Sequence, residues 1–138
     1  MTCIISLNIR GLGASPKLLA FKNLLYYLHP YIILIQESMH NVTKVVLYFR
    51  KMFLNWYIYA ITSSSLSRAL AALWDPSWVS IKVFPCFEGI LLKASFCRIP
   101  GNIHILNIYA PYKDQFIFWD QVFSSGMMEL VSLIIVGT

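Results

Sequence analysis

The sequence contains few charged residues for its length. Only 12% of its 138 residues are Asp, Glu, Lys or Arg and 58% are apolar or aromatic, whereas a typical soluble domain has about 25% charged residues. A membrane protein or part of a larger core would have such a composition. A membrane-spanning helix needs about 20 consecutive apolar residues, but the best candidate, LLYYLHPYIILI, is short and contains His29 and Pro30. The pattern excludes a spanning helix and favours part of a larger core.

Cysteine and secretion signals are also scarce. Cys3, Cys86 and Cys97 are widely spaced and form no C-x-x-C pair, so neither a disulfide framework nor a zinc site is indicated, and we expect reduced core thiols. The first residues, MTCIISLNIRGLG, lack the basic start, long apolar stretch and cleavage site of a signal peptide. We therefore expect an intracellular protein, located in the nucleus or the cytoplasm.

Acidic residues are outnumbered by basic ones. Eleven Lys and Arg against six Asp and Glu give a formal net charge of +5, which favours approach to a polyanion such as DNA. The basic residues are scattered, however, and Arg50-Lys51 is the one adjacent pair. A solvated surface explains that pair more simply than a phosphate-binding patch does. Charge alone therefore does not define a function.

The first part of the chain predicts a strand, a helix and a second strand. Residues 3–10 (CIISLNIR) are typical of a buried strand, and Ser15-Pro16 then begins a helix that runs to about Leu28. His29-Pro30 ends this helix, and residues 31–36 (YIILIQ) predict the next strand. Strands joined in this way normally lie parallel. We therefore expect Asn8 and Glu37 near the same end of one sheet.

The remaining sequence predicts further strands between two helical segments. Residues 41–53 indicate a helix with an apolar face. Short β-rich runs then follow at residues 55–62, 69–74, 79–84, 89–96 and 104–111, in the manner of a meander. Residues 114–132 predict a helical segment that Gly126 can interrupt, and residues 133–137 predict a final strand. We expect one domain over residues 1–138.

Three polar residues near predicted strand ends are candidates for chemistry. Glu37 is the only acid in the first 74 residues; a strand-end carboxylate suits Mg²⁺, with a solvated or salt-bridged Glu as the alternative. Asn8 can hydrogen-bond a phosphate oxygen or orient Glu37, or else form a turn before GLG. Tyr109, in NIYAP, can donate its phenol to an anion or be a core aromatic with a hydrated hydroxyl. The residues alone leave these alternatives open.

Three motifs, LNIRGLG, LIQES and HILNIYAPY, resemble in order and spacing the endonuclease/exonuclease/phosphatase superfamily, especially the endonuclease domain of plant LINE-type (non-LTR) retrotransposons. The resemblance extends to ALAALWDPSW and FEGILLKASF. It implies a four-layer α/β sandwich, with two sheets packed between outer helices. It also implies metal-assisted hydrolysis of DNA with Mg²⁺ or Mn²⁺. By this resemblance, Glu37 binds the metal, Asn8 orients the metal or the phosphate, and Tyr109 contacts the phosphate.

The last residues depart from the pattern of that superfamily. Its strand after the second helical segment ends in G-D-x-N, whose Asp is expected to position the attacking water, whereas this sequence reads Val136-Gly137-Thr138. The later strands with their Asp-His pair are also absent. We therefore expect a partial, catalytically inactive endonuclease domain whose uncovered sheet face promotes aggregation or self-association. A non-catalytic nucleic-acid-binding module and a relic without function are the alternatives.

Overall fold

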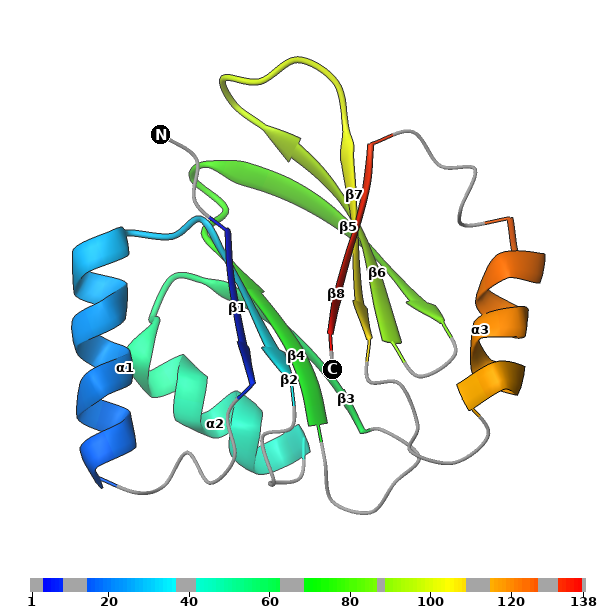
Figure 1. Ribbon diagram of the computed structural model, residues 1–138. Helices are drawn as coiled ribbons and strands as arrows, with labels where there is room; N and C mark the ends of the chain where they lie inside the picture. The colour runs from blue at the N-terminus through cyan, green and yellow to red at the C-terminus, as the bar shows by residue number, and fades with distance from the viewer. Residues whose placement is uncertain are drawn as a thin grey trace.

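The computed structural model describes residues 4–8, 15–36, 42–62, 69–86, 89–108, 115–126 and 132–137. These residues form two four-stranded sheets that pack face to face between outer helices (Figure 1). Along the chain the elements are β1 (Ile4–Asn8), α1 (Ser15–Leu28), β2 (Ile32–Gln36), α2 (Val42–Met52), β3 (Tyr57–Thr62), β4 (Ala69–Trp74), β5 (Val79–Cys86), β6 (Gly89–Phe96), β7 (Ile103–Ile108), α3 (Gln115–Ser124) and β8 (Leu133–Gly137). The predicted α/β sandwich is confirmed.

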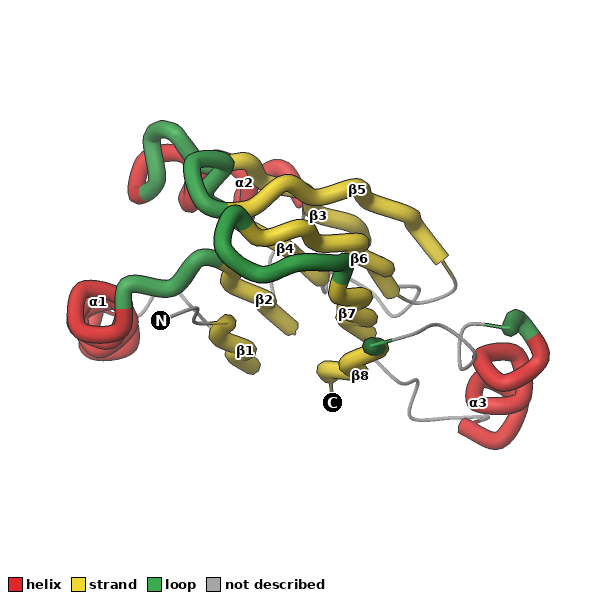
Figure 2. The backbone as a smooth tube through the Cα atoms, turned by 90° about the horizontal axis from the view of Figure 1, so that it is seen from above, coloured by secondary structure: helices red, strands yellow, loops and turns green. Residues whose placement is uncertain are grey.

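The layers follow one another from α1 and α2, through the two sheets, to α3 (Figure 2). The first sheet has the strand order β1-β2-β4-β3, and the second has the order β5-β6-β7-β8. Each sheet is mixed and has one parallel pair at one of its edges, β1 with β2 and β7 with β8. These two edges lie against each other, because β1 contacts β8 and β2 contacts β7.

The predicted strand, helix and strand at the start of the chain are confirmed. Helix α1 begins at Ser15 and ends at Leu28. His29 then takes a left-handed conformation with φ of 48°, and its N–H donates to the Leu25 carbonyl at 3.0 Å, which satisfies a carbonyl at the helix end. Pro30 prevents the helix from continuing. Strands β1 and β2 are parallel, and Asn8 lies opposite Gln36.

The predicted meander is divided between the two sheets. Strands β3 and β4 form an antiparallel pair beside β2 in the first sheet, whereas β5, β6 and β7 form an antiparallel run in the second. The chain changes sheets at Asp75–Trp78, where Asp75 Oδ1 accepts a hydrogen bond from the Ser77 N–H at 3.0 Å. Every residue of β4 is buried, as in an interior strand, whereas β5 alternates mostly between half-buried and exposed positions, as in an edge strand.

Three apolar clusters hold the layers together. The first fills the space between the sheets, with fully buried Leu34, Ile90 and Ile105 among its members. The second joins the first sheet to α1 and α2, and the third joins the second sheet to α3. The inner sheet faces therefore cover each other, which corrects the expectation of an uncovered face. Exposed apolar side chains lie instead on the outer helices and on edge strands β3, β5 and β8, where Ile134 of β8 is 45% exposed.

The cysteines and the expectation of no membrane-spanning helix can both be compared with the described residues. Cys86 is half-buried and Cys97 is exposed, and both are free thiols, so Cys97 is not the core residue that we expected. Burial raises the pKa of the Cys86 thiol. Cys3 lies outside the described residues. Within the described segments, no helix has the length and apolar character that crossing a membrane requires.

Candidate functional site at the strand ends

The carboxyl ends of four strands meet at one end of the sandwich. Asn8 of β1 lies opposite Gln36 of β2, and Asn107 of β7 lies opposite Val136 of β8. Gln36 and Asn107 are hydrogen-bonded to each other across the two sheets. The four strands therefore finish at the same level, and Figure 1 shows β1 and β8 running in the same direction toward it. We call this region the strand-end site.

A network of hydrogen bonds, buried except at Ser6, spans the sandwich at this level. The Gln36 Nε2 group donates to Asn107 Oδ1 at 2.8 Å, and the Asn107 Nδ2 group donates to the Ala71 carbonyl at 3.1 Å. The Ser6 hydroxyl donates to Gln36 Oε1 at 3.2 Å. We call these four residues the polar bridge. It links β1, β2 and β4 of the first sheet to β7 of the second.

Sequence reasoning missed the polar bridge, although the sequence contains a signal for it. Gln36 is the one polar residue in the buried strand β2, and Asn107 stands between buried Leu106 and Ile108 in β7. A buried amide normally has hydrogen-bond partners, so two such amides in apolar strands indicate a pairing. The sequence does not say which strands face each other, because the two residues are 71 positions apart.

Of the three predicted site residues, the structure describes Asn8 and leaves Glu37 and Tyr109 undescribed. Asn8 ends β1, has an exposed side chain and lies opposite Gln36, at the rim of the strand-end site. Glu37 and Tyr109 lie outside the described residues, as does Thr138. Along the chain, Glu37 directly follows Gln36, and Tyr109 is two positions beyond Asn107. Each of these two segments therefore leaves its strand just after a residue of the polar bridge.

Two glycines allow a close approach to the end of β7. A β-carbon on Gly137 would overlap the Ile108 carbonyl oxygen and lie 2.9 Å from Ile108 Cγ1. A β-carbon on Gly89 would lie 2.6 Å from Ile108 Cγ2 and 2.8 Å from the Asn107 carbonyl oxygen. Real β-carbons do not come this close to backbone atoms. The end of β7 is therefore held between β6 and β8 at a spacing that only glycine permits.

A divalent metal at the strand-end site would need oxygen ligands from nearby side chains. Within the segments that the structure describes, no three His, Cys, Asp or Glu side chains form a cluster suited to a metal. The described carboxylates are Asp75, in the turn after β4, and Asp120, in α3. The Asn8 side chain offers a neutral oxygen at the rim, a ligand type that suits Mg²⁺ or Mn²⁺ and not zinc. The residues fit a site for Mg²⁺ or Mn²⁺ with oxygen ligands if Glu37, which directly follows Gln36 in the sequence, supplies the carboxylate.

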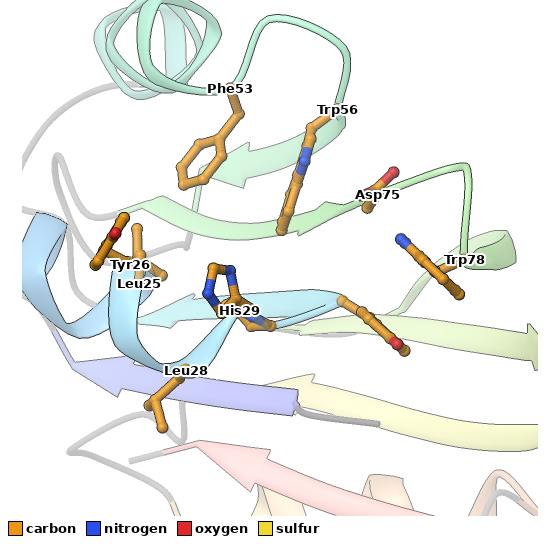
Figure 3. A pocket seen from close by; sticks show the side chains of 10 residues that line it. Leu25, Tyr26, Leu28, His29, Phe53, Trp56, Asp75 and Trp78 are labelled. Atoms are coloured by element: carbon orange, nitrogen blue, oxygen red, sulfur yellow. The ribbon is translucent and has the colours of Figure 1, made fainter. Parts of the chain in front are cut away.

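A cavity of about 600 Å³ lies at the other end of the first sheet, where β2 begins and β4 ends. Its lining is largely aromatic and includes Tyr31, Trp56 and Trp78; Figure 3 labels the two Trp side chains. The Tyr31 and Trp78 rings are stacked, with centroids 5.2 Å apart. Asp75 supplies a carboxylate to the lining, but its Oδ1 already accepts the Ser77 N–H. The cavity shares no residue with the strand-end site.

Comparison with known proteins identifies the fold. No protein-family model and no curated protein matches the sequence. Among solved structures, D. rerio TDP2 complexed with single-strand DNA product has a TM-score of 0.67 at 16% identity, covering 99% of this chain and 58% of that one. An endonuclease/exonuclease/phosphatase family protein from Bacteroides thetaiotaomicron has a TM-score of 0.67 at 10% identity, covering 99% and 62%. The 3' phosphatase NExo from Neisseria, bound to product DNA hairpin, has a TM-score of 0.58 at 17% identity, covering 99% and 57%.

These similarities define the class of structure to which the chain corresponds. Two mixed sheets between outer helices form the fold of the endonuclease/exonuclease/phosphatase proteins, among which are nucleases and phosphatases. The chain spans about three fifths of the length of the matching structures. At identities of 10 to 17% the similarity establishes the fold alone.

Proposed function

We propose that the chain is the amino-terminal part of a metal-dependent DNA endonuclease that derives from a LINE-type retrotransposon. The observation that carries this proposal is the convergence of strand ends, where Asn8 lies opposite Gln36, the residue that precedes Glu37. The fold similarity to a DNA-bound TDP2 and the net charge of +5 support a DNA substrate. The retrotransposon origin rests on the three sequence motifs.

The proposal gives a role to each residue of the strand-end site. Glu37 and Asn8 would hold Mg²⁺ or Mn²⁺, which when bound supplies positive charge to a phosphate oxygen. Tyr109 would donate a hydrogen bond from its phenol to the same phosphate. Thr138 stands where the superfamily has an Asp, and an ordinary Thr hydroxyl is a far weaker proton acceptor than a carboxylate. Losing a positioned acid or base costs about 10² to 10⁴ in rate, so the 138 residues would bind metal and DNA with hydrolysis near background.

Metal binding and nicking of supercoiled plasmid test this function in the purified chain. We expect Mn²⁺ binding, detected by the loss of the free-ion signal in electron paramagnetic resonance, and no turnover with Mg²⁺. Glu37→Gln should abolish Mn²⁺ binding, whereas Asp75→Asn, at the other end of the sheet, should leave it unchanged. A wild-type chain that binds no Mn²⁺ would overturn the proposed metal site. Sustained nicking that Glu37→Gln removes would overturn the proposed inactivity.

The same net charge favours a second candidate, a module that binds nucleic acid without cutting it. Binding of a DNA duplex by a monodisperse sample, weakening steeply with salt and unaffected by Glu37→Gln, would favour this module over the endonuclease. Absence of binding at low salt would exclude it.

Whether the reading frame belongs to a longer enzyme has a test that requires no protein. An Asp-x-Asn pattern in any frame after the codon for Thr138 would show that the reading frame belongs to a longer enzyme. Its absence would favour a relic. An intracellular location is part of the same proposal, and imaging of a tagged chain would test it.

A further inference from the structure

We propose that Gln36 and Asn107 are positioning residues of the strand-end site. Their polar bridge holds the ends of β2 and β7 in one relative position across the sandwich. The segments that begin with Glu37 and Tyr109 therefore leave from fixed points on two different sheets. This inference rests on the proposed metal-dependent function, because it assigns the bridge to the residues that would bind metal and phosphate.

Stability does not explain the presence of Gln36 and Asn107. Among the described residues they are the only buried polar side chains, with exposures of 2% for Gln36 and 0% for Asn107. A buried hydrogen-bonded pair contributes little net stability, because its gain is offset by loss of hydrogen bonds to water, and an apolar pair of similar shape does about as well. The surrounding inner cluster consists of apolar side chains such as Leu34 and Ile105.

The polar bridge fixes the relative position of the two sheets. Apolar contacts are non-directional, so they resist sliding of one sheet over the other only through shape. The bridge adds directional bonds to three strands of the first sheet, through Ser6, Gln36 and the Ala71 carbonyl. On the other side, Gly89 and Gly137 allow β6 and β8 to hold the end of β7 closely. Asn107 is therefore fixed within its own sheet and tied to the opposite one.

The polar bridge lies at the strand-end site. The inner cluster between the sheets is otherwise apolar, and among the described residues buried amides occur only near the ends of β2 and β7. Glu37 follows one of them directly, and Tyr109 follows the other after Ile108. In metal sites, residues that orient the ligands without touching the metal typically contribute 10- to 100-fold to affinity.

The test measures Mn²⁺ affinity of the whole 138-residue chain, under conditions in which circular dichroism shows each variant to be folded. We expect Asn107→Leu and Gln36→Leu to weaken Mn²⁺ binding by about 10- to 100-fold. The exchanged pair, Gln36→Asn with Asn107→Gln, keeps both amides and the total side-chain length, and should recover most of the affinity. Ile105→Ala removes an inner-face side chain of the same strand β7 without touching the bridge, and should bind Mn²⁺ like the wild type.

The Mn²⁺ affinities of the variants distinguish the positioning role from the metal site itself. Wild-type affinity in both Leu variants would overturn the positioning role while leaving the metal site intact. An equal loss in Ile105→Ala would also overturn it, because any damage to the core would then have the same effect. If the Leu variants do not fold, Asn107→Asp takes their place, because it retains the acceptor for Gln36 Nε2 and loses the donor to the Ala71 carbonyl. Its Mn²⁺ affinity is then compared with that of Ile105→Ala in the same way. A wild-type chain without Mn²⁺ binding would overturn the proposed function itself, and this inference with it.

Discussion

The polar bridge makes a quantitative prediction about stability. Asn107→Leu removes the hydrogen bonds to Gln36 and Ala71 and leaves the buried Gln36 amide without an acceptor. One unsatisfied buried group costs about 1–3 kcal/mol, so we expect a loss of about 2–4 kcal/mol when the Ala71 carbonyl is included. Gln36→Leu should cost less, about 1–3 kcal/mol, because the exposed Ser6 hydroxyl can turn to water.

The double variant separates the bridge from ordinary packing. When both amides are replaced by Leu, no amide of the pair remains buried without a partner. The double variant should therefore be more stable than the sum of the single losses indicates, by about 1–3 kcal/mol. Urea unfolding followed by the fluorescence of the four Trp residues measures all four free energies. In a domain of ordinary stability, about 5–15 kcal/mol, such differences shift the midpoint measurably.

A matched cycle controls for general damage to the core. Leu92 lies in the cluster between the sheets and Ile33 in the cluster under the helices. Their Ala variants should add to within about 0.5 kcal/mol, because the two side chains occupy different clusters. If the Gln36 and Asn107 variants were equally additive, the two amides would not act as a unit, and the reasoning from the polar bridge would be refuted.

Three further predictions follow from other parts of the molecule. Gly137→Ala should destabilise the chain by about 1–3 kcal/mol in urea unfolding, because its β-carbon would overlap the Ile108 carbonyl oxygen; an unchanged midpoint would contradict this. Tyr48→Phe should raise the melting temperature, because the buried Tyr48 hydroxyl has no hydrogen-bond partner among the described residues. Burial also raises the pKa of Tyr48, so the wild type should lose more stability than Tyr48→Phe as the pH rises above about 10. Ile134→Lys should reduce self-association, measured by light scattering, because β8 is an edge strand without charge or proline. Phe84→Lys should have little effect, because Phe84 is also 45% exposed but edge strand β5 already contains Lys82 and Pro85.

Local signals in the sequence predicted the elements well where one residue type dictates the geometry. Ser15-Pro16 and His29-Pro30 marked both ends of α1, since proline is favoured at the first position of a helix and disfavours helical geometry in the residue before it. The buried run YIILIQ and the small-residue run ALAALW were likewise found as strands β2 and β4. These features depend on neighbours in the chain, which the sequence displays directly.

The assignment of strands to sheets could not be predicted in the same way. A run of antiparallel strands and a run divided by the turn at Asp75–Trp78 have the same alternation of side chains, so the pattern alone favoured a meander. The polar bridge was missed for a related reason. Gln36 and Asn107 are paired only because two separate sheets stack with one particular offset, and that offset is set by the whole inner cluster.

The end of β8 is fixed by a close contact between Gly137 and Ile108. Gly137 lies opposite Ile108, so β8 ends at the same level as β7, and this register depends on the missing β-carbon of Gly137. Under the proposed function, Thr138 replaces the Asp that the resemblance implies, which would remove a carboxylate without changing the contact between Gly137 and Ile108. On this argument, Gly137→Ala should reduce stability and Mn²⁺ affinity together, whereas Thr138→Ala should change neither.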